Sequence, residues 1–206
     1  MRLLIFVGFL ATIVGVHATV AAATFELAPQ VTKEINVNIG SDPTWLPRPE
    51  QQSLALETVE LYLETIDGAR YAEAYAMHDP VFQAYQTLDL FIELEERVRT
   101  VAGPTELWRV LKVTWSKDPE YAPGPGIYAA IDLTALFEKA DRYCGYIILY
   151  QETETSDFRV MRREFSILDN ASASSIEAEQ SKAHVEELWA EMSQYCPNYV
   201  PITEIQ

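Results

Sequence analysis

Apolar residues change their spacing at Gly103-Pro104, and this change constrains the fold more than any other feature of the chain. Before it, apolar residues recur every three or four positions, which is the spacing of one face of an α-helix. After it, they alternate with polar residues or form short runs rich in Val, Ile and aromatic residues, which is typical of β-strands. A helical half followed by a strand half predicts an α+β domain.

The helical half predicts three helices. The first has apolar residues at positions 56, 59, 63 and 66 and ends at Gly68. The second spans 71–76 and stops at Asp79-Pro80, and the third runs from a cap at Thr87 to Gly103-Pro104. One acidic residue, Glu95, interrupts the apolar stripe of the third helix without changing its period.

The strand half predicts four consecutive strands, at 107–115, 127–137, 143–151 and 158–168. We therefore expect residues 50–169 to form a cone-like α+β domain, with three N-terminal helices packed on a curved four-stranded antiparallel sheet. Residues 24–49 are an extended leader, in which 34–39 is suited to an edge strand. Residues 170–206 hold a C-terminal helix and a tail, and the apolar side of that helix is expected to pack on the sheet.

The N-terminus has the pattern of a secretory signal. Met1-Arg2 precedes fourteen uncharged residues, 3–16, and a small-residue tract that ends in Ala21-Ala22-Ala23. Fourteen helical residues span about 21 Å, less than the ~30 Å hydrocarbon core of a bilayer. We expect residues 1–23 to be a signal peptide cleaved near Ala23, and the mature protein to be periplasmic or secreted. A retained membrane anchor is the alternative.

The chain is acidic, with 31 Asp and Glu against 15 Lys and Arg and a net charge of −16. Such a charge repels phosphate backbones and anionic lipid headgroups, which argues against nucleic acid and anionic membrane surfaces as partners. A basic protein partner is one interpretation, and a soluble acidic surface without a particular partner is the other. The sequence contains no Gly-rich phosphate loop, nucleophile elbow or metal-ligand cluster, so no cofactor and no metal are expected.

Cys144 and Cys196 are the only cysteines. In an oxidising compartment an even pair predicts one disulfide bond, which would hold the last helix to the third predicted strand. Closing a loop of about fifty residues contributes ~4 kcal/mol in the chain-entropy model. Two unpaired thiols are the alternative.

Four short motifs resemble a known family. They are Ala69-Arg-Tyr-Ala-Glu-Ala-Tyr75 after the first helix, the turn Pro123-Gly-Pro-Gly-Ile-Tyr128, Phe137-Glu-Lys139, and Phe158-Arg-Val-Met-Arg-Arg-Glu-Phe165. With these motifs, residues 54–168 resemble an exported bacterial family of unknown function. The order of elements is similar to the nuclear-transport-factor-2-like (cystatin-like) superfamily. The resemblance implies a cone in which helices fill the concave side of a curved sheet, and it implies export, but it supplies no substrate.

Four residues are candidates for lining a ligand pocket: His78, Trp115, Tyr128 and Asp132. His78, next to Asp79, is either a general base paired with a carboxylate or a histidine that caps carbonyls at a helix end. Asp132 and Tyr128 would imitate the aspartate base and tyrosine donor of some enzymes of the similar superfamily only if their strand face points inward. We expect the apolar residues of that strand to face inward instead. Trp115 is one of several strand aromatics suited to the wall of a cavity.

These features favour an exported, non-catalytic module that binds a partner or a small apolar ligand, because no catalytic constellation is present. The alternatives are a small isomerase- or hydrolase-like enzyme with a pocket carboxylate, and a structural envelope component. A cavity of ~300 Å³ or more, with an aromatic wall and His78 or Asp132 in its lining, would favour the enzyme. A solidly packed interior would leave surface interaction alone.

Overall fold

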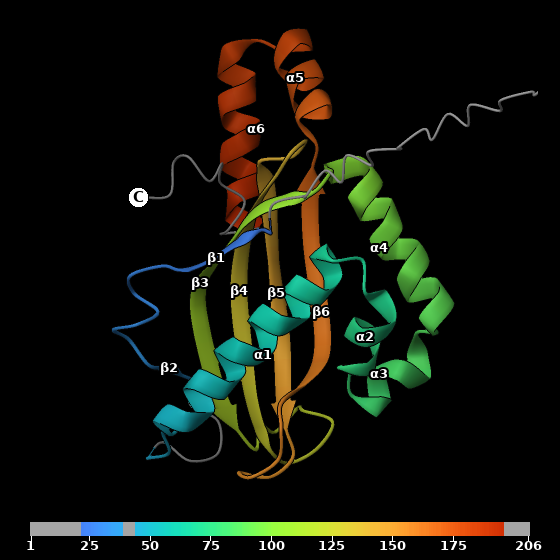
Figure 1. The fold of residues 1–206 in the computed structure, drawn as a ribbon. Coiled ribbons are helices and arrows are strands. Elements are labelled where there is room, and N and C mark those ends of the chain that lie inside the picture. The colour runs from blue at the N-terminus through green and yellow to red at the C-terminus, as the bar shows by residue number, and fades with distance from the viewer. Residues whose placement is uncertain (1–21, 39–43, 196–206) are drawn as a thin grey trace, which may run out of the picture.

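The computed structural model of the 206-residue chain describes residues 22–38 and 44–195 (Figure 1). Nearly all of the predicted signal peptide, 1–23, lies outside the described residues, as do Cys196 and the rest of the predicted tail. None of the described helices is long and apolar enough to cross a membrane.

A mixed β-sheet forms the centre of the described chain. Its strands lie in the order β1 (Thr24–Leu27), β3 (Thr105–Lys117), β4 (Ile127–Phe137), β5 (Arg142–Gln151) and β6 (Arg159–Leu168), and β2 (Asn36–Val37) also pairs with β3. Neighbours from β3 to β6 are antiparallel, whereas β1 and β2 run parallel to β3. The expectation of a four-stranded antiparallel sheet is therefore wrong, because it counted neither leader strand in the sheet and both run parallel to β3.

The two leader strands lie in tandem along one edge of β3. Leu27 is in register with Val110, and Asn36 with Thr114, so successive parts of the leader cover this edge. Their pairing satisfies backbone groups that an edge strand otherwise leaves open. β2 lies within 34–39, the segment expected to suit an edge strand, whereas β1, with four residues, is too short for a period of two to reveal it in the sequence.

Among the described residues, four helices and not three precede β3: α1 (Pro49–Asp67), α2 (Tyr71–Ala76), α3 (Pro80–Tyr85) and α4 (Leu88–Ala102). The unexpected one, α3, begins at Asp79-Pro80, which we interpreted only as a stop. The Asp79 carboxylate accepts a hydrogen bond from the backbone N–H of Val81 at 2.8 Å, and proline suits the first helical position. α4 has the predicted ends, with Thr87 as its N-cap and Gly103 at a φ of 78°.

α1 crosses one face of the sheet diagonally, while α2, α3 and α4 lie beside β6 (Figure 1). We call the face under α1 the inner face and the opposite one the outer face. Alternate residues of β4, beginning with Ile127, are buried on the inner face with Val59, Tyr62 and Leu63 of α1. The intervening residues of β4, Asp132 among them, belong to the outer face.

The C-terminal region is a hairpin of two helices, α5 (Asn170–Glu179) and α6 (Lys182–Tyr195), which extends beyond the end of the sheet (Figure 1). Gln180 between them has an extended backbone, so the single helix that we expected is interrupted there. The apolar residues of α6 are only half-buried, and they do not cover the sheet as expected. Instead Arg142 of β5 holds the hairpin: its guanidinium bonds Glu177 at 2.9 Å and lies 4.6 Å from the ring centre of Trp189.

Candidate functional site

A buried ion pair joins α4 to β6 on the inner face. Nη1 of Arg163 donates to Oε1 of Glu95 at 2.6 Å, and the two side chains are 6% and 7% exposed. Strand alternation turns Arg163 inward while its neighbours Arg162 and Glu164 remain exposed and pair with each other. Glu95 is inward because it lies within the apolar stripe of α4, so each partner follows the pattern of its own element.

Three further polar side chains surround this pair. Tyr62 of α1 and Tyr143 of β5 are fully buried near the guanidinium of Arg163, and the Tyr62 hydroxyl lies 3.3 Å from Nε2 of His78. Together, Glu95, Arg163, Tyr62, Tyr143 and His78 form what we call the interior polar cluster. Four elements of the domain and the α2–α3 junction each contribute one member to it.

Burial decides the protonation states in this cluster. Desolvation lowers the pKa of His78 to about 4, and it raises the pKa of Tyr143 to about 12 and that of Tyr62 further. The imidazole and both phenols are therefore neutral near pH 7. The only formal charges of the cluster are those of Arg163 and Glu95, and they cancel.

Two nitrogen atoms of the cluster, Nε of Arg163 and Nδ1 of His78, are buried without a hydrogen-bond partner. Both residues line a cavity of about 200 Å³, the interior cavity, between α3, α4 and β6. Its walls are aromatic: Phe82 stacks on His78 with ring centres 4.0 Å apart, and Phe91 meets the same ring edge-on at 5.2 Å. This volume is below the ~300 Å³ that would favour an enzyme.

A second cavity, of about 550 Å³, lies between α1 and the N-terminal part of β3, and a carboxylate lines it. Asp67 accepts hydrogen bonds from Oγ1 of Thr105 at 2.7 Å and from Nε1 of Trp108 at 2.8 Å. Burial raises the pKa of Asp67, although these bonds and the nearby arginines oppose the shift. Because Thr105 and Trp108 belong to β3, these two hydrogen bonds tie α1 to β3 and occupy both oxygens of the Asp67 carboxylate.

A third cavity, of about 670 Å³, involves the outer face, and we call it the outer cavity. Tyr128 and Tyr150 line it together with the β5–β6 loop and the start of α3.

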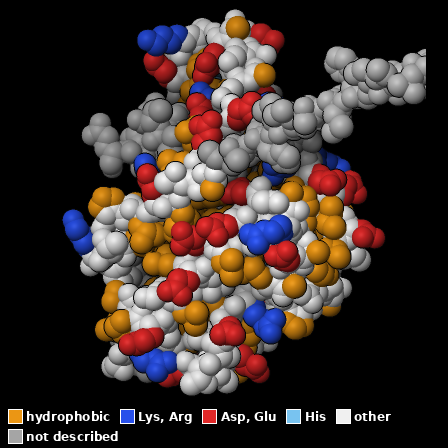
Figure 2. Space-filling view, viewed as in Figure 1, with side chains coloured by type: hydrophobic (Ala, Val, Ile, Leu, Met, Phe, Trp, Pro, Cys, Tyr) orange, Lys and Arg blue, Asp and Glu red, His pale blue; other side chains and the backbone are white. Residues whose placement is uncertain are grey.

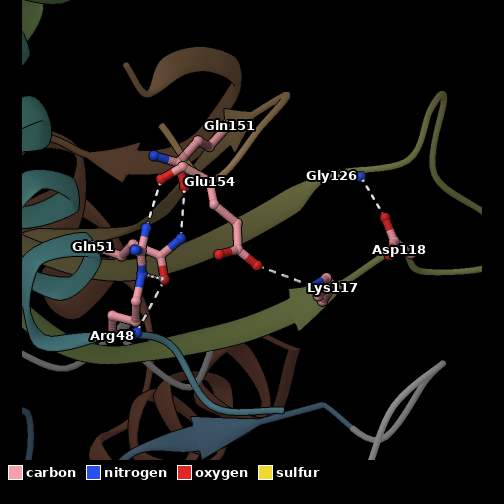
Figure 3. A network of polar contacts seen from close by, with 7 residues as sticks. All are labelled: Arg48, Gln51, Lys117, Asp118, Gly126, Gln151 and Glu154. Atoms are coloured by element: carbon pink, nitrogen blue, oxygen red, sulfur yellow. Dashed lines mark hydrogen bonds and ion pairs between the residues drawn. The ribbon is translucent and has the colours of Figure 1, made fainter. Parts of the chain in front are cut away.

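Polar contacts fix the β5–β6 loop to the start of α1 (Figure 3). Nε2 of Gln51 donates to Oε1 of Gln151 at 2.9 Å, and Nη2 of Arg48 donates to the carbonyl of Glu154 at 2.6 Å. Nε2 of the Gln151 side chain in turn donates to the backbone carbonyl of Ser156 at 2.6 Å. One wall of the outer cavity is thereby held by an element of the inner face.

The four predicted pocket residues do not come together. His78 lines the interior cavity and Tyr128 the outer one. Trp115 is a core residue whose ring packs edge-on against Phe158 at 6.1 Å. Asp132 is half-buried on the outer face opposite Lys112, and burial raises its pKa. With Asp132 and Tyr128 outside, the buried aspartate-and-tyrosine pair of the similar superfamily's enzymes has no counterpart in these two residues.

Cys144 lies on β5 and is not a free thiol. Cys196 falls just after the last described residue, so the bond between the two cysteines remains a prediction. The helix that the bond would hold does not lie on the sheet face, as described above.

Charge marks no site on the side of the molecule that carries α1. Figure 2 shows acidic and basic side chains interspersed over this side. Within the described residues, no group of three or more His, Cys, Asp or Glu side chains is arranged to hold a metal ion.

The sequence reasoning missed Glu95 and Arg163 as partners. A signal was present, because Glu95 interrupts an inward apolar stripe and Arg163 occupies an inward strand position. Charged side chains on inward positions must be paired to be tolerated.

One comparison with known proteins finds a match. The family described as "Protein of unknown function (DUF4019)" matches residues 58–161, within the segment whose motifs resemble a family of unknown function. No curated protein and no solved structure matches the chain.

Proposed function

We propose that this chain, which belongs to the DUF4019 family of proteins of unknown function, is an exported, non-catalytic module that holds a small uncharged molecule in the interior cavity. The observation that carries the proposal is the buried, unpartnered Nε–H of Arg163, a residue that lines a cavity with aromatic walls.

The unpartnered donor defines what the occupant must offer. A guanidinium has only donors, and a buried donor without an acceptor costs about 1–3 kcal/mol. An occupant with a carbonyl or amide oxygen removes that cost. Phe82, Phe91 and Phe165 would pack against its apolar body.

The charges of the cluster favour an uncharged occupant. Glu95 already neutralises Arg163 at 2.6 Å, so an anion would meet no net positive charge in the cluster. It would still lose its hydration on entering. A cation would likewise meet no net negative charge in the cluster, and it too would lose its hydration.

The protonation states favour binding over catalysis. A general base works best with a pKa near the operating pH, whereas burial places the pKa of His78 at about 4. The Glu95 carboxylate is engaged by Arg163, and both oxygens of Asp67 accept hydrogen bonds in the fold. The isomerase- or hydrolase-like alternative therefore lacks a free carboxylate at the interior cavity.

The proposed location rests on residues 1–23, whose uncharged run and Ala21-Ala22-Ala23 ending are typical of a cleaved signal. Sequencing of the mature N-terminus should find Thr24 or a close neighbour, and Met1 retained in a membrane fraction would contradict export. Helices over one face of the sheet and the antiparallel order β3 to β6 support a further proposal, kinship with the nuclear-transport-factor-2-like superfamily.

Three probes of similar size test the ligand class. Benzamide carries a ring and a neutral acceptor, benzoate carries a charge, and toluene has no acceptor. Titration followed by NMR should show benzamide binding at least about fivefold more tightly than either of the others, because a net hydrogen bond contributes about 1 kcal/mol. Failure of all three to bind would mean that water fills the cavity, and tighter binding of benzoate would equally overturn the proposal.

The double variant Arg163→Met/Glu95→Leu removes the donor without leaving a lone buried charge. It should bind benzamide and toluene equally. Arg162→Met, on the adjacent exposed position of β6, is the matched control and should keep the preference for benzamide.

A further inference from the structure

The outer cavity has two tyrosine rings whose hydroxyls are already engaged. Tyr128 donates to the carbonyl of Gly124 at 2.7 Å, and Tyr150 donates to the carbonyl of Pro125 at 2.9 Å. The ring centres lie 5.0 Å apart with a 38° angle between the planes. Tyr128 is buried and Tyr150 half-buried, so what the pair can still offer an occupant is mainly the ring surface of Tyr150.

The loop 118–126 holds these rings in place. Oδ1 of Asp118 accepts from the backbone N–H of Gly126 at 2.7 Å, which closes the loop (Figure 3). Gly126 has a φ of 144°, and a Cβ there would lie 2.6 Å from Cε2 of Tyr150. Glycine at this position lets the loop rest directly on the ring, so the ring surface is part of a built wall rather than a free side chain.

The other polar lining of the cavity is mainly negative. The carboxylates of Asp79, Glu152 and Asp157 line it, against the single guanidinium of Arg159. Among the described residues, no ion pair involves any of these three carboxylates. Burial is the largest cause that raises the pKa of Tyr150, and the charges of Glu152 and Asp79 raise it further. The negative field thus reaches the rings.

A compact metal ion does not fit this arrangement. The carboxylates do not converge on one point, and no metal-holding group of acidic residues occurs in the part of the chain that the structure describes. A larger cation with its charge spread over several carbon atoms suits both features, because the faces of aromatic rings attract such cations and the carboxylates add long-range attraction. The net charge of −16 acts in the same direction.

We propose that the outer cavity binds a small organic ammonium compound, whose cationic head packs on the ring of Tyr150, beside Tyr128, between the carboxylates of Glu152 and Asp157 and within the field of Asp79. The site is separate from the interior cavity and independent of the function proposed for it.

The test compares choline with its uncharged carbon isostere, 3,3-dimethylbutan-1-ol, by calorimetry on the mature chain at low salt. Choline should bind at least about tenfold more tightly, because ring and carboxylates both act on the charge. Binding should weaken when salt is added. n-Butylammonium, whose charge is concentrated on one –NH₃⁺ group, should bind more weakly than choline, and tighter binding of n-butylammonium would contradict the role given to spread charge. Equal affinity for choline and the isostere would overturn the proposal, as would the absence of ammonium binding.

Two variants place the binding in this cavity. Tyr150→Leu should weaken choline binding about fivefold, whereas Tyr150→Phe keeps the ring and should retain most of the affinity. Glu152 is exposed, so Glu152→Gln leaves the fold intact and should weaken choline about threefold without affecting the isostere. If Glu152→Gln and Tyr150→Leu both bind choline like the wild type, the site lies elsewhere and the proposal fails.

Discussion

Replacing Glu95 by Gln tests the interior polar cluster directly. The change removes the negative charge that lies 2.6 Å from Arg163 and keeps the shape of the side chain. A guanidinium does not lose its proton in proteins, so its charge stays buried without a counter-ion. Neutral Tyr62 and Tyr143 cannot replace that counter-ion. We expect Glu95→Gln to lower the free energy of unfolding by about 3–5 kcal/mol, which is a large part of the roughly 5–15 kcal/mol that stabilises a domain.

The matching double variant separates the charge from the packing. Arg163→Met/Glu95→Leu replaces both charges by apolar side chains of similar volume, which is often neutral or stabilising for a buried pair. We therefore expect its free energy of unfolding to lie within about 1 kcal/mol of the wild-type value or above that value. Arg162→Met is the control for an exposed pair and should cost less than about 1 kcal/mol.

Urea denaturation at pH 7, followed by tryptophan fluorescence, measures all four proteins on one scale. The double-mutant cycle, completed with the single variants Arg163→Met and Glu95→Leu, gives the coupling energy of the pair. A loss below about 1 kcal/mol for Glu95→Gln would refute the reasoning. So would a double variant whose loss equals the sum of the two single losses, because the charges would then not depend on each other.

Three further predictions concern pH, packing and crosslinking. Burial lowers the pKa of His78 from 6.5 to about 4, so the unfolded chain binds more protons between these values. The stability that His78 contributes above pH 6.5 is therefore lost as the pH falls to 4. His78→Phe should reduce the dependence of the urea midpoint on pH between these values, and an unchanged dependence would contradict the lowered pKa. Gly145→Ala should lower the stability measured by thermal denaturation by about 1–3 kcal/mol, since its Cβ would lie 2.6 Å from the hydroxyl of Tyr143. Gly124→Ala is the control and should leave the stability nearly unchanged, because the atom nearest to its Cβ lies 3.8 Å away. Native protein should show no free thiol by mass spectrometry, and Cys144→Ser/Cys196→Ser should lower stability by up to ~4 kcal/mol; two free thiols would exclude the bond.

Long elements with a clear period were predictable from the sequence. The stripe of α1 and its end at Gly68, the caps of α4 and the four long strands β3 to β6 all lie where the patterns indicated. Each of these elements buries a face many residues long, so its period is set by the core that it covers. The sheet as a whole was still predicted wrongly, because β1 and β2 are held by backbone pairing along β3 rather than by a periodic apolar face.

The C-terminal region failed for a different reason. The apolar stripe of α6 predicts packing on a sheet surface, but α5 and α6 pack against each other and are held by Arg142 at the start of β5. A stripe shows that a helix has a partner without showing which one. Side-chain contacts as local as the one between Arg142 and Trp189 leave no periodic trace in the sequence.

The interior cavity was hidden by one misinterpreted pair of residues. Asp79-Pro80 ends one helical segment and begins another, and Phe82 of the overlooked α3 is the residue that stacks on His78. Without α3, His78 stands at an exposed helix end, where capping carbonyls is the natural interpretation. With α3 in place the imidazole is enclosed, its pKa falls, and the cavity has its wall. Candidate sites that depend on short helices are therefore the ones that sequence periodicity is least able to find, since six residues bury too little surface to impose a pattern.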